Sequence, residues 1–243
     1  MSKTDEMAGW RQWQLSLLFF AAGALLLLLP CWGAWRYLEG AGYKAQQAAW
    51  LALIFSVCLE MVWLPLLALA AVDGAAGGAR GFAAIFAGAT IAGAAIDFAA
   101  RGASGDVLWA QAMCLAVAAL AAAICRLAAA NSLSPAAGKC LATAILAFIY
   151  TNPFWARLAL ESVADVGKRN LFTHISVWLA PIPCLSIAFE GFNFATDLGK
   201  IYRIWLGPVV PYPPHPLAFT AVYLLAAGAL YAVAAGLARV IKK

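Results

Sequence analysis

Long runs of apolar residues, separated by short stretches that contain charged or turn-forming residues, make up most of this chain. A helix that crosses the hydrocarbon core of a bilayer needs ~20 apolar residues, because each residue advances the helix by only about 1.5 Å. We place six such spans, at about 13–33, 47–72, 81–99, 107–125, 136–156 and 217–238. The pattern predicts an all-α fold, a polytopic transmembrane helical bundle in which residues 1–243 form a single transmembrane domain.

A further apolar segment, 171–189, is interrupted by Pro181 and Pro183, a spacing that breaks a helix. The segment can cross the membrane as a bent seventh span, or enter and return as a re-entrant hairpin that protein or a water cavity shelters. The proline break favours six spans. Orientation stays open, because a cytoplasmic N-terminus with six spans places eight of the 16 Lys and Arg residues inside.

Composition points to the same class of protein. Hydrophobic residues account for 65% of the chain and charged residues for 11%, with a mean hydropathy of +0.85. Soluble domains carry roughly a quarter charged residues. We therefore expect the lipid bilayer as a partner and a multi-pass location in a cell membrane, presumed to be a bacterial inner membrane. The net charge of +5 is spread over short loops, which excludes a nucleic-acid-binding patch.

The stretch 72–101 resembles in part the signature of the CDP-alcohol phosphotransferases. It carries Asp73-Gly74, then Ala79-Arg80, and then Gly93 four residues before Asp97. Such enzymes, as the resemblance implies, use four aspartates on facing helices to hold divalent metals and to supply a base.

Two of the four aspartate positions depart from that signature. The first is occupied by Ala70 and the fourth by Arg101, a cation where a metal ligand is required. The spacing of four residues between Asp97 and Arg101 instead predicts an ion pair at a helix end. We therefore expect a tight connection between two spans here, and no enzyme activity.

Glu60 lies near the middle of the span predicted at 47–72. A carboxylate inside a membrane span costs a few kcal/mol, so it has to face a partner or a polar cavity. It is the candidate for a proton or cation site, or for part of a substrate path. The alternatives are an interhelical hydrogen bond, a permanently protonated acid, or a span centred elsewhere.

Glu161, Asp165 and Arg169 follow one another at a spacing of four, which places them on one face of a helix. This face is either solvated at the membrane surface or docks a partner subunit.

Metal and cofactor sites are not expected. His174 and His215 are the chain's two histidines and lie on separate segments, and the six cysteines include no CxxC pair. We therefore expect no cofactor and no metal.

The order and length of the segments resemble the membrane subunit, or permease, of an ATP-binding-cassette exporter. Such permeases, as the resemblance implies, have six spans, a re-entrant pair of helices between the fifth and sixth, and a basic C-terminal tail. Residues 157–214 and the final RVIKK occupy the corresponding places. The resemblance implies transport in a complex with other subunits, including an ATPase. The connection 73–81 departs from it, since it is too short for the cytoplasmic coupling helix that these permeases carry between spans two and three.

The alternative function is a non-catalytic membrane anchor or scaffold subunit of a larger complex. Abundant Trp and small residues on the predicted helices favour it, since both residue types suit packing within and between membrane helices.

Overall fold

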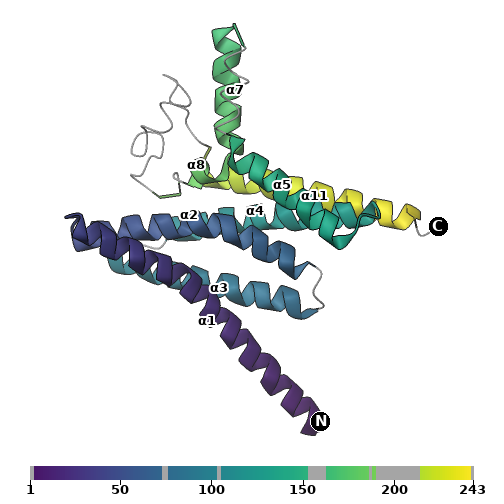
Figure 1. Cartoon of the computed structure of the whole chain (residues 1–243), viewed down its shortest axis with the longest axis horizontal. Coiled ribbons are helices and arrows are strands. Elements are labelled where there is room, and N and C mark those ends of the chain that lie inside the picture. The colour runs from purple at the N-terminus through teal and green to yellow at the C-terminus, as the bar shows by residue number, and fades with distance from the viewer. Residues whose placement is uncertain are drawn as a thin grey trace. The chain divides into compact units, whose positions relative to one another are not determined.

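The apolar runs fold as helices throughout the part of the chain that the computed structural model describes (Figure 1). That part comprises residues 3–72, 76–102, 105–152, 163–185, 188–189 and 214–241. Its regular elements are all α-helices, without a strand. The predicted all-helical fold is therefore confirmed for these residues, and the length and apolar character of the helices define a multi-pass membrane protein.

Five of the described helices are long and apolar enough to cross a bilayer, and each overlaps one predicted span. They are α1 (Lys3–Gly40), α2 (Ala45–Ala71), α3 (Ala76–Arg101), α4 (Gly105–Ala130) and α11 (Pro216–Ile241). A shorter apolar helix, α5 (Pro135–Tyr150), covers the first part of the span predicted at 136–156. The rest of that span, from residue 153, lies outside the described residues.

The end of α4 and the start of α5 are set by turn-forming and capping residues and not by the position of a charged residue. α4 continues four residues past Arg126, whose side chain is exposed, so this charge leaves the span predicted at 107–125 without ending the helix. The helix stops at a turn in which Ser132 adopts a positive φ of 63°. Ser134 then caps α5, since its hydroxyl accepts a hydrogen bond from the Ala137 backbone N–H at 3.2 Å.

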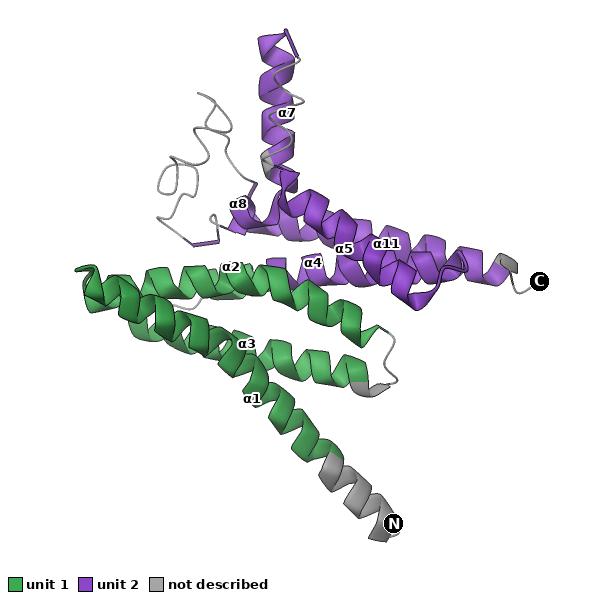
Figure 2. Ribbon diagram, in the orientation of Figure 1, with its two compact units in different colours: residues 1–111 green, residues 112–243 purple. Residues whose placement is uncertain are grey.

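The chain forms two compact units, Met1–Gln111 (unit 1) and Ala112–Lys243 (unit 2), coloured separately in Figure 2. Unit 1 contains α1, α2, α3 and the first turns of α4. In unit 1, α1 packs against both α2 and α3, and α2 packs against α3. The three helices thus form a self-contained helical layer around a shared buried face.

Two glycines set how closely α1 and α3 approach. A methyl group added at Gly23 would collide with the Ile85 backbone carbonyl, and one added at Gly88 would collide with the carbonyl of Phe20. Each glycine therefore lies directly against the backbone of the other helix. Small residues at a helix crossing allow this approach, which in a membrane gives van der Waals contacts that larger side chains would prevent.

In unit 2 the apolar segment predicted at 171–189 contains two helices. α7 (Val166–Leu179) ends one residue before Ala180, and the five-residue α8 (Pro181–Leu185) begins at the first proline. The break falls where the residue before a proline is pushed out of helical geometry. The hydroxyl of Tyr223 on α11 donates to the Leu179 carbonyl at 2.7 Å, which satisfies a backbone acceptor at the end of α7.

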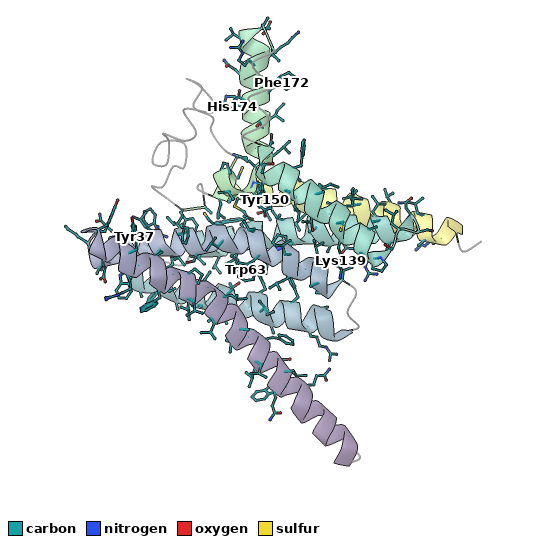
Figure 3. The ribbon with its side chains drawn as sticks, in the orientation of Figure 1. Tyr37, Trp63, Lys139, Tyr150, Phe172 and His174 are labelled. Carbon is teal, nitrogen blue, oxygen red and sulfur yellow. The ribbon has the colours of Figure 1, made fainter. Side chains whose placement is uncertain are left out.

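The start of the same segment is attached to the end of α5. The side-chain amide of Asn152 donates to the Ser176 carbonyl at 2.9 Å, and the Ser176 hydroxyl donates to Asn152 Oδ1 at 3.1 Å. Both residues are buried. Figure 3 shows Phe172 and His174 on α7, one turn or less before this attachment.

Replacing Gly88 by Val will separate α1 from α3, because the backbone of Phe20 cannot move away as a side-chain end could. We expect a loss of about 2–3 kcal/mol in the free energy of unfolding, measured by tryptophan fluorescence in mild detergent. The matched control is Gly33→Val on α1, where an added methyl group meets nothing within 4 Å. Equal stability of the two variants would contradict the proposed crossing.

Candidate functional site

Glu60 lies on the buried face of α2, 15 residues after the helix begins at Ala45 and 11 before it ends at Ala71. The side chain is completely buried (0% exposed), as are those of Leu53, Val57 and Leu64. These positions are three or four residues apart and form one stripe of the helix. The fold therefore buries the carboxyl group because it occupies a position within the apolar packing face of a membrane-length helix.

Two polar side chains from other helices, the buried Gln111 and the half-buried Thr90, complete a cluster with this carboxyl group, which we call the Glu60 cluster (Glu60, Thr90, Gln111). The Gln111 side-chain amide at the start of α4 donates to Glu60 Oε2 at 2.6 Å. Gln111 is also buried, and its Oε1 lies 3.2 Å from the Thr90 hydroxyl of α3. The hydroxyl also lies 2.8 Å from the Phe86 carbonyl, so its one proton serves one of these two acceptors at a time.

The second carboxyl oxygen of Glu60, Oε1, is buried and has no hydrogen-bond partner. An unsatisfied buried oxygen of a charged group costs more than the 1–3 kcal/mol typical of a neutral group. A proton on the carboxyl group removes the charge and with it most of that cost. The geometry therefore leaves Glu60 with one oxygen bonded to Gln111 and one buried oxygen without a partner.

A second polar cluster lies at the helix end where α3 gives way to α4. We call it the Arg101 cluster (Trp50, Asp97, Arg101, Asp106). Arg101 donates to Asp97 Oδ1 at 2.8 Å and to Asp106 Oδ2 at 2.7 Å. Its guanidinium group also lies over the Trp50 ring of α2, 5.4 Å from the ring centroid.

Burial differs sharply within this cluster. The Asp97 side chain is 0% exposed, whereas Arg101 is 25% and Asp106 is 19% exposed. The Asp97 carboxylate uses Oδ1 for Arg101, while its buried Oδ2 has no hydrogen-bond partner. Asp97 thus depends on one cation that itself reaches the surface of the fold.

The other residues selected from the sequence have local structural contacts. Asp165 accepts a hydrogen bond from the Lys168 backbone N–H at 2.8 Å and so caps α7. The Arg169 guanidinium donates to the Val163 carbonyl at 2.7 and 3.1 Å. Glu161, the third member of the predicted docking face, lies outside the described residues. The described contacts of Asp165 and Arg169 therefore stabilise the start of α7.

The histidines are far apart in the chain and are not part of a ligand set. His215 Nδ1 accepts from the Leu217 backbone N–H at 3.2 Å, at the start of α11, while His174 is on α7 (Figure 3). Within the described residues, no three His, Cys, Asp or Glu side chains come close enough to hold a metal ion.

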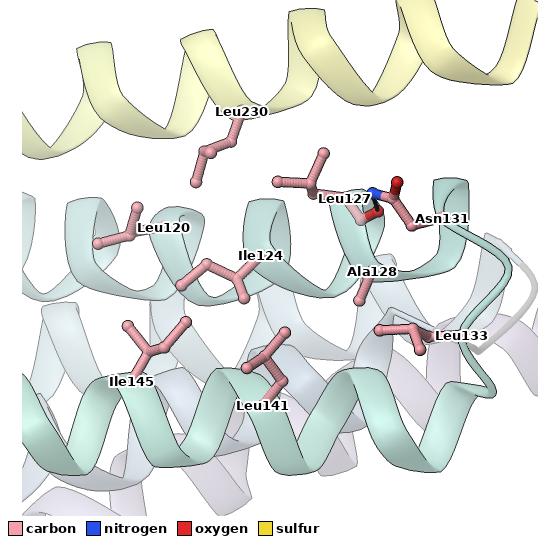
Figure 4. A pocket seen from close by; sticks show the side chains of 9 residues that line it. All are labelled: Leu120, Ile124, Leu127, Ala128, Asn131, Leu133, Leu141, Ile145 and Leu230. Atoms are coloured by element: carbon pink, nitrogen blue, oxygen red, sulfur yellow. Dashed lines mark hydrogen bonds between the residues drawn. The ribbon is translucent and has the colours of Figure 1, made fainter. Parts of the chain in front are cut away.

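Unit 2 contains an apolar cavity of about 440 Å³ between α4, α5 and α11 (Figure 4). Leucine and isoleucine side chains dominate the lining, and Asn131 is the polar residue at one end, next to the α4–α5 turn. The full lining is Leu120, Ile124, Leu127, Ala128, Asn131, Leu133, Leu141, Ile145 and Leu230. Such a surface suits hydrocarbon and offers no group for chemistry on a polar substrate.

Sequence reasoning selected Glu60, Asp97 and Arg101 but missed three of their partners. Thr90 and Gln111 are isolated polar residues inside apolar runs, and such residues in a membrane helix normally face another polar group. Asp106 could not be recognised from the sequence as a partner of Arg101, because it follows the turn after Arg101 and belongs to the next helix. Only packing shows that these partners converge.

The chain matches no protein-family model, no curated protein and no solved structure. Fold and site together define its class as a multi-pass helical membrane protein with a carboxyl group buried inside its first unit. Any finer assignment has to come from the chemistry of the Glu60 and Arg101 clusters.

Replacing Arg101 by Gln will leave the buried Asp97 carboxylate without its cation. Removing one member of a buried ion pair costs about 3–5 kcal/mol, and we expect the lower end of that range because Arg101 is partly exposed. Thermal and chemical unfolding in detergent will measure the loss. The control is Arg36→Gln, since Arg36 is 65% exposed and lies 3.7 Å from Glu39, which makes its contribution small. Similar losses in both variants would show that Asp97 does not depend on Arg101.

Proposed function

We propose that this chain is an integral membrane subunit of a transport complex, and that Glu60 is a proton-exchanging residue in its translocation step. The observation that supports this is the Glu60 carboxyl group itself, completely buried near the middle of a membrane-length helix with one oxygen unpartnered. Ionisable residues inside membrane spans are costly and commonly belong to ion paths or proton relays. The proposal includes no catalytic activity and places the protein in a bacterial inner membrane.

A proton fits the Glu60 cluster better than a metal cation does. A cation would need several oxygen ligands around it, whereas the Gln111 amide nitrogen occupies the contact with Glu60 Oε2 at 2.6 Å. That N–H group stabilises the ionised carboxylate, and after protonation Oε1 can carry the proton. The cluster can therefore hold both states of Glu60 without rearranging a coordination shell.

If the transport complex is an ATP-binding-cassette exporter, an ATPase subunit is a further partner. The permeases that this chain resembles in segment order would contact that subunit through a coupling helix between spans two and three. In this chain α2 ends at Ala71 and α3 begins at Ala76, which leaves residues 72–75 as the connection. An ATPase partner would have to bind elsewhere, so the proposal rests on Glu60 and not on the exporter layout.

An anchor or scaffold subunit is the second candidate function, and the apolar cavity of unit 2 favours it. A cavity lined by Leu120, Ile124 and Leu230 accepts a hydrocarbon chain or an apolar helix of another subunit. Under this function Glu60 would serve only as an interhelical hydrogen-bond acceptor.

Proton movement through the assembly will require Glu60. The chain, purified with any subunits that it retains in mild detergent, is reconstituted into liposomes that contain a pH-sensitive dye, and a potassium gradient with valinomycin drives proton entry. We expect uptake above that of empty liposomes and a fall to the empty-liposome rate in Glu60→Gln, which keeps the shape of the side chain but cannot exchange a proton.

The matched control is Glu39→Gln, the same substitution at a residue whose side chain is 29% exposed. It should leave proton uptake unchanged. Thermal unfolding of both variants checks that they fold. Equal uptake by wild-type protein and Glu60→Gln would rule out the proton-exchanging role and leave the scaffold function.

Mass spectrometry of the subunits that stay bound in mild detergent will distinguish an exporter from a complex in which the chain is an anchor or scaffold. Recovery of an ATPase in fixed proportion supports the exporter form. Recovery of a membrane complex without an ATPase, together with loss of that complex in Leu230→Trp, supports docking through the unit 2 cavity. Retention of the complex by Leu230→Trp would argue against docking there.

A further inference from the structure

On both α2 and α3, the Arg101 cluster lies near one end of unit 1 and the Glu60 cluster lies farther from that end. α2 begins, α3 ends and α4 begins at one end of the unit, as the contact of Arg101 with Trp50 and Asp106 shows. From that end, Asp97 precedes Thr90 by seven residues on α3, about 10 Å along the helix axis. Trp50 precedes Glu60 by ten residues on α2, about 15 Å. The Glu60 cluster therefore lies deeper in the unit than the Arg101 cluster.

An apolar layer separates the two clusters. Gly93 lies between Asp97 and Thr90 on the same face of α3, because residues three, four and seven apart share a face. A methyl group added at Gly93 would lie 3.1 Å from Val107 Cγ1, 3.3 Å from Leu27 Cδ2 and 3.9 Å from Leu53 Cδ1.

These three apolar side chains come from α4, α1 and α2 and are each 0% exposed. We call the set the Gly93 layer (Leu27, Leu53, Gly93, Val107). On α2, Val57 lies between Leu53 of this layer and Glu60 and is also 0% exposed, so the apolar region between the clusters includes Val57.

Each side of this layer carries a carboxyl oxygen that has no hydrogen-bond partner. On the outer side it is Asp97 Oδ2, and on the inner side it is Glu60 Oε1. Both atoms are buried, and each can accept a hydrogen bond from a water molecule. Acceptors on opposite sides of an apolar layer are what a transient proton path requires at its ends.

The Arg101 cluster itself carries a net negative charge, one positive charge from Arg101 against two negative charges from Asp97 and Asp106. Arg36, Glu39 and Lys44 lie at the same end of the unit and add two positive charges and one negative charge, so the attraction for protons is local to the cluster.

Other titratable groups on helices packed against α2 include Cys31, which hydrogen-bonds with Ser56 one turn before Glu60. Nearer the helix ends they include Arg36, Tyr37, Glu39 and Arg80.

We propose that protons reach Glu60 from the end of unit 1 that carries the Arg101 cluster, by way of Asp97, and that the Gly93 layer is the barrier which controls their entry. The proposal rests on the proton-exchanging role of Glu60 and adds the direction of access and the residues that limit it. Leu53, Val107 and Leu27 close the layer in this structure. A rotamer change of these side chains, which pack directly against Gly93, admits the water that connects Asp97 to Glu60.

The test measures how fast the Glu60 carboxyl group exchanges its proton for deuterium. Time-resolved infrared spectroscopy of the purified, membrane-reconstituted assembly after mixing with D₂O follows the C=O band of the protonated acid, and the loss of that band in Glu60→Gln assigns it to Glu60. We expect Leu53→Ala and Val107→Ala to speed the exchange by about threefold or more, the change that lowering a barrier by about 0.65 kcal/mol produces.

Gly93→Ala should act in the opposite direction. Its methyl group would lie 3.1 Å from Val107 Cγ1 and 3.3 Å from Leu27 Cδ2, closer than ordinary van der Waals contact, so it crowds the layer and the exchange should slow by about threefold. The opposite signs matter because general loss of packing would speed exchange in every variant. The matched control is Leu64→Ala, which removes the same atoms from a fully buried leucine of α2 on the other side of Glu60. It should leave the exchange rate unchanged.

Each other outcome overturns the proposal in a recognisable way. Faster exchange in Leu64→Ala, with no change in Leu53→Ala, would place the entry route at the opposite end of the unit. Exchange that speeds up in Gly93→Ala would show that the layer is not the barrier. In both cases proton uptake by the liposomes would still depend on Glu60. Absence of a Glu60 band at every pH would instead overturn the proton-exchanging role on which the route depends.

Discussion

The hydrogen bond between Gln111 and Glu60 is the constraint on which unit 1 depends most. A membrane helix can bury a carboxyl group only if a neighbouring helix supplies a polar partner at the same depth. Meeting that need fixes the register of the first turns of α4 against α2, and Thr90 extends the same requirement to α3. The apolar side chains around them are interchangeable within limits of volume, whereas the three polar residues have to meet at one point.

Much of the fold follows from the sequence, and the reasons are physical. Apolar run length predicts membrane helices because a bilayer leaves the backbone few alternatives to internal hydrogen bonding. Helix ends are less accessible, as Arg126 illustrates: its long side chain reaches out of the apolar region while the helix continues. The importance of Glu60 could be recognised from its position alone. Its partners could not, because Gln111 lies 51 positions after Glu60 and the intervening sequence carries no signal of which helices come together.

Buried polar groups are stabilised in different ways in the two units. In unit 1 charged and amide side chains are paired across helices in two clusters that an apolar layer separates. In unit 2 the polar contacts serve the backbone where a helix breaks, as Asn152 and Tyr223 do for Ser176 and Leu179 around α7. The first pattern concentrates ionisable groups within one unit. The polar contacts of unit 2 stabilise the segment that is broken by prolines. The cavity of the same unit is lined by apolar side chains.

The length of α1 has a mechanical consequence. A helix of 38 residues is about 57 Å long, whereas a bilayer with its headgroups is about 40–45 Å thick. A helix longer than the bilayer is thick has to tilt within it or extend past it. Gly23, where α1 touches the backbone of α3, is about 30 Å along the axis from Lys3. Because Leu27 of the Gly93 layer follows this contact by one turn, a change of tilt at the crossing would act directly on the layer.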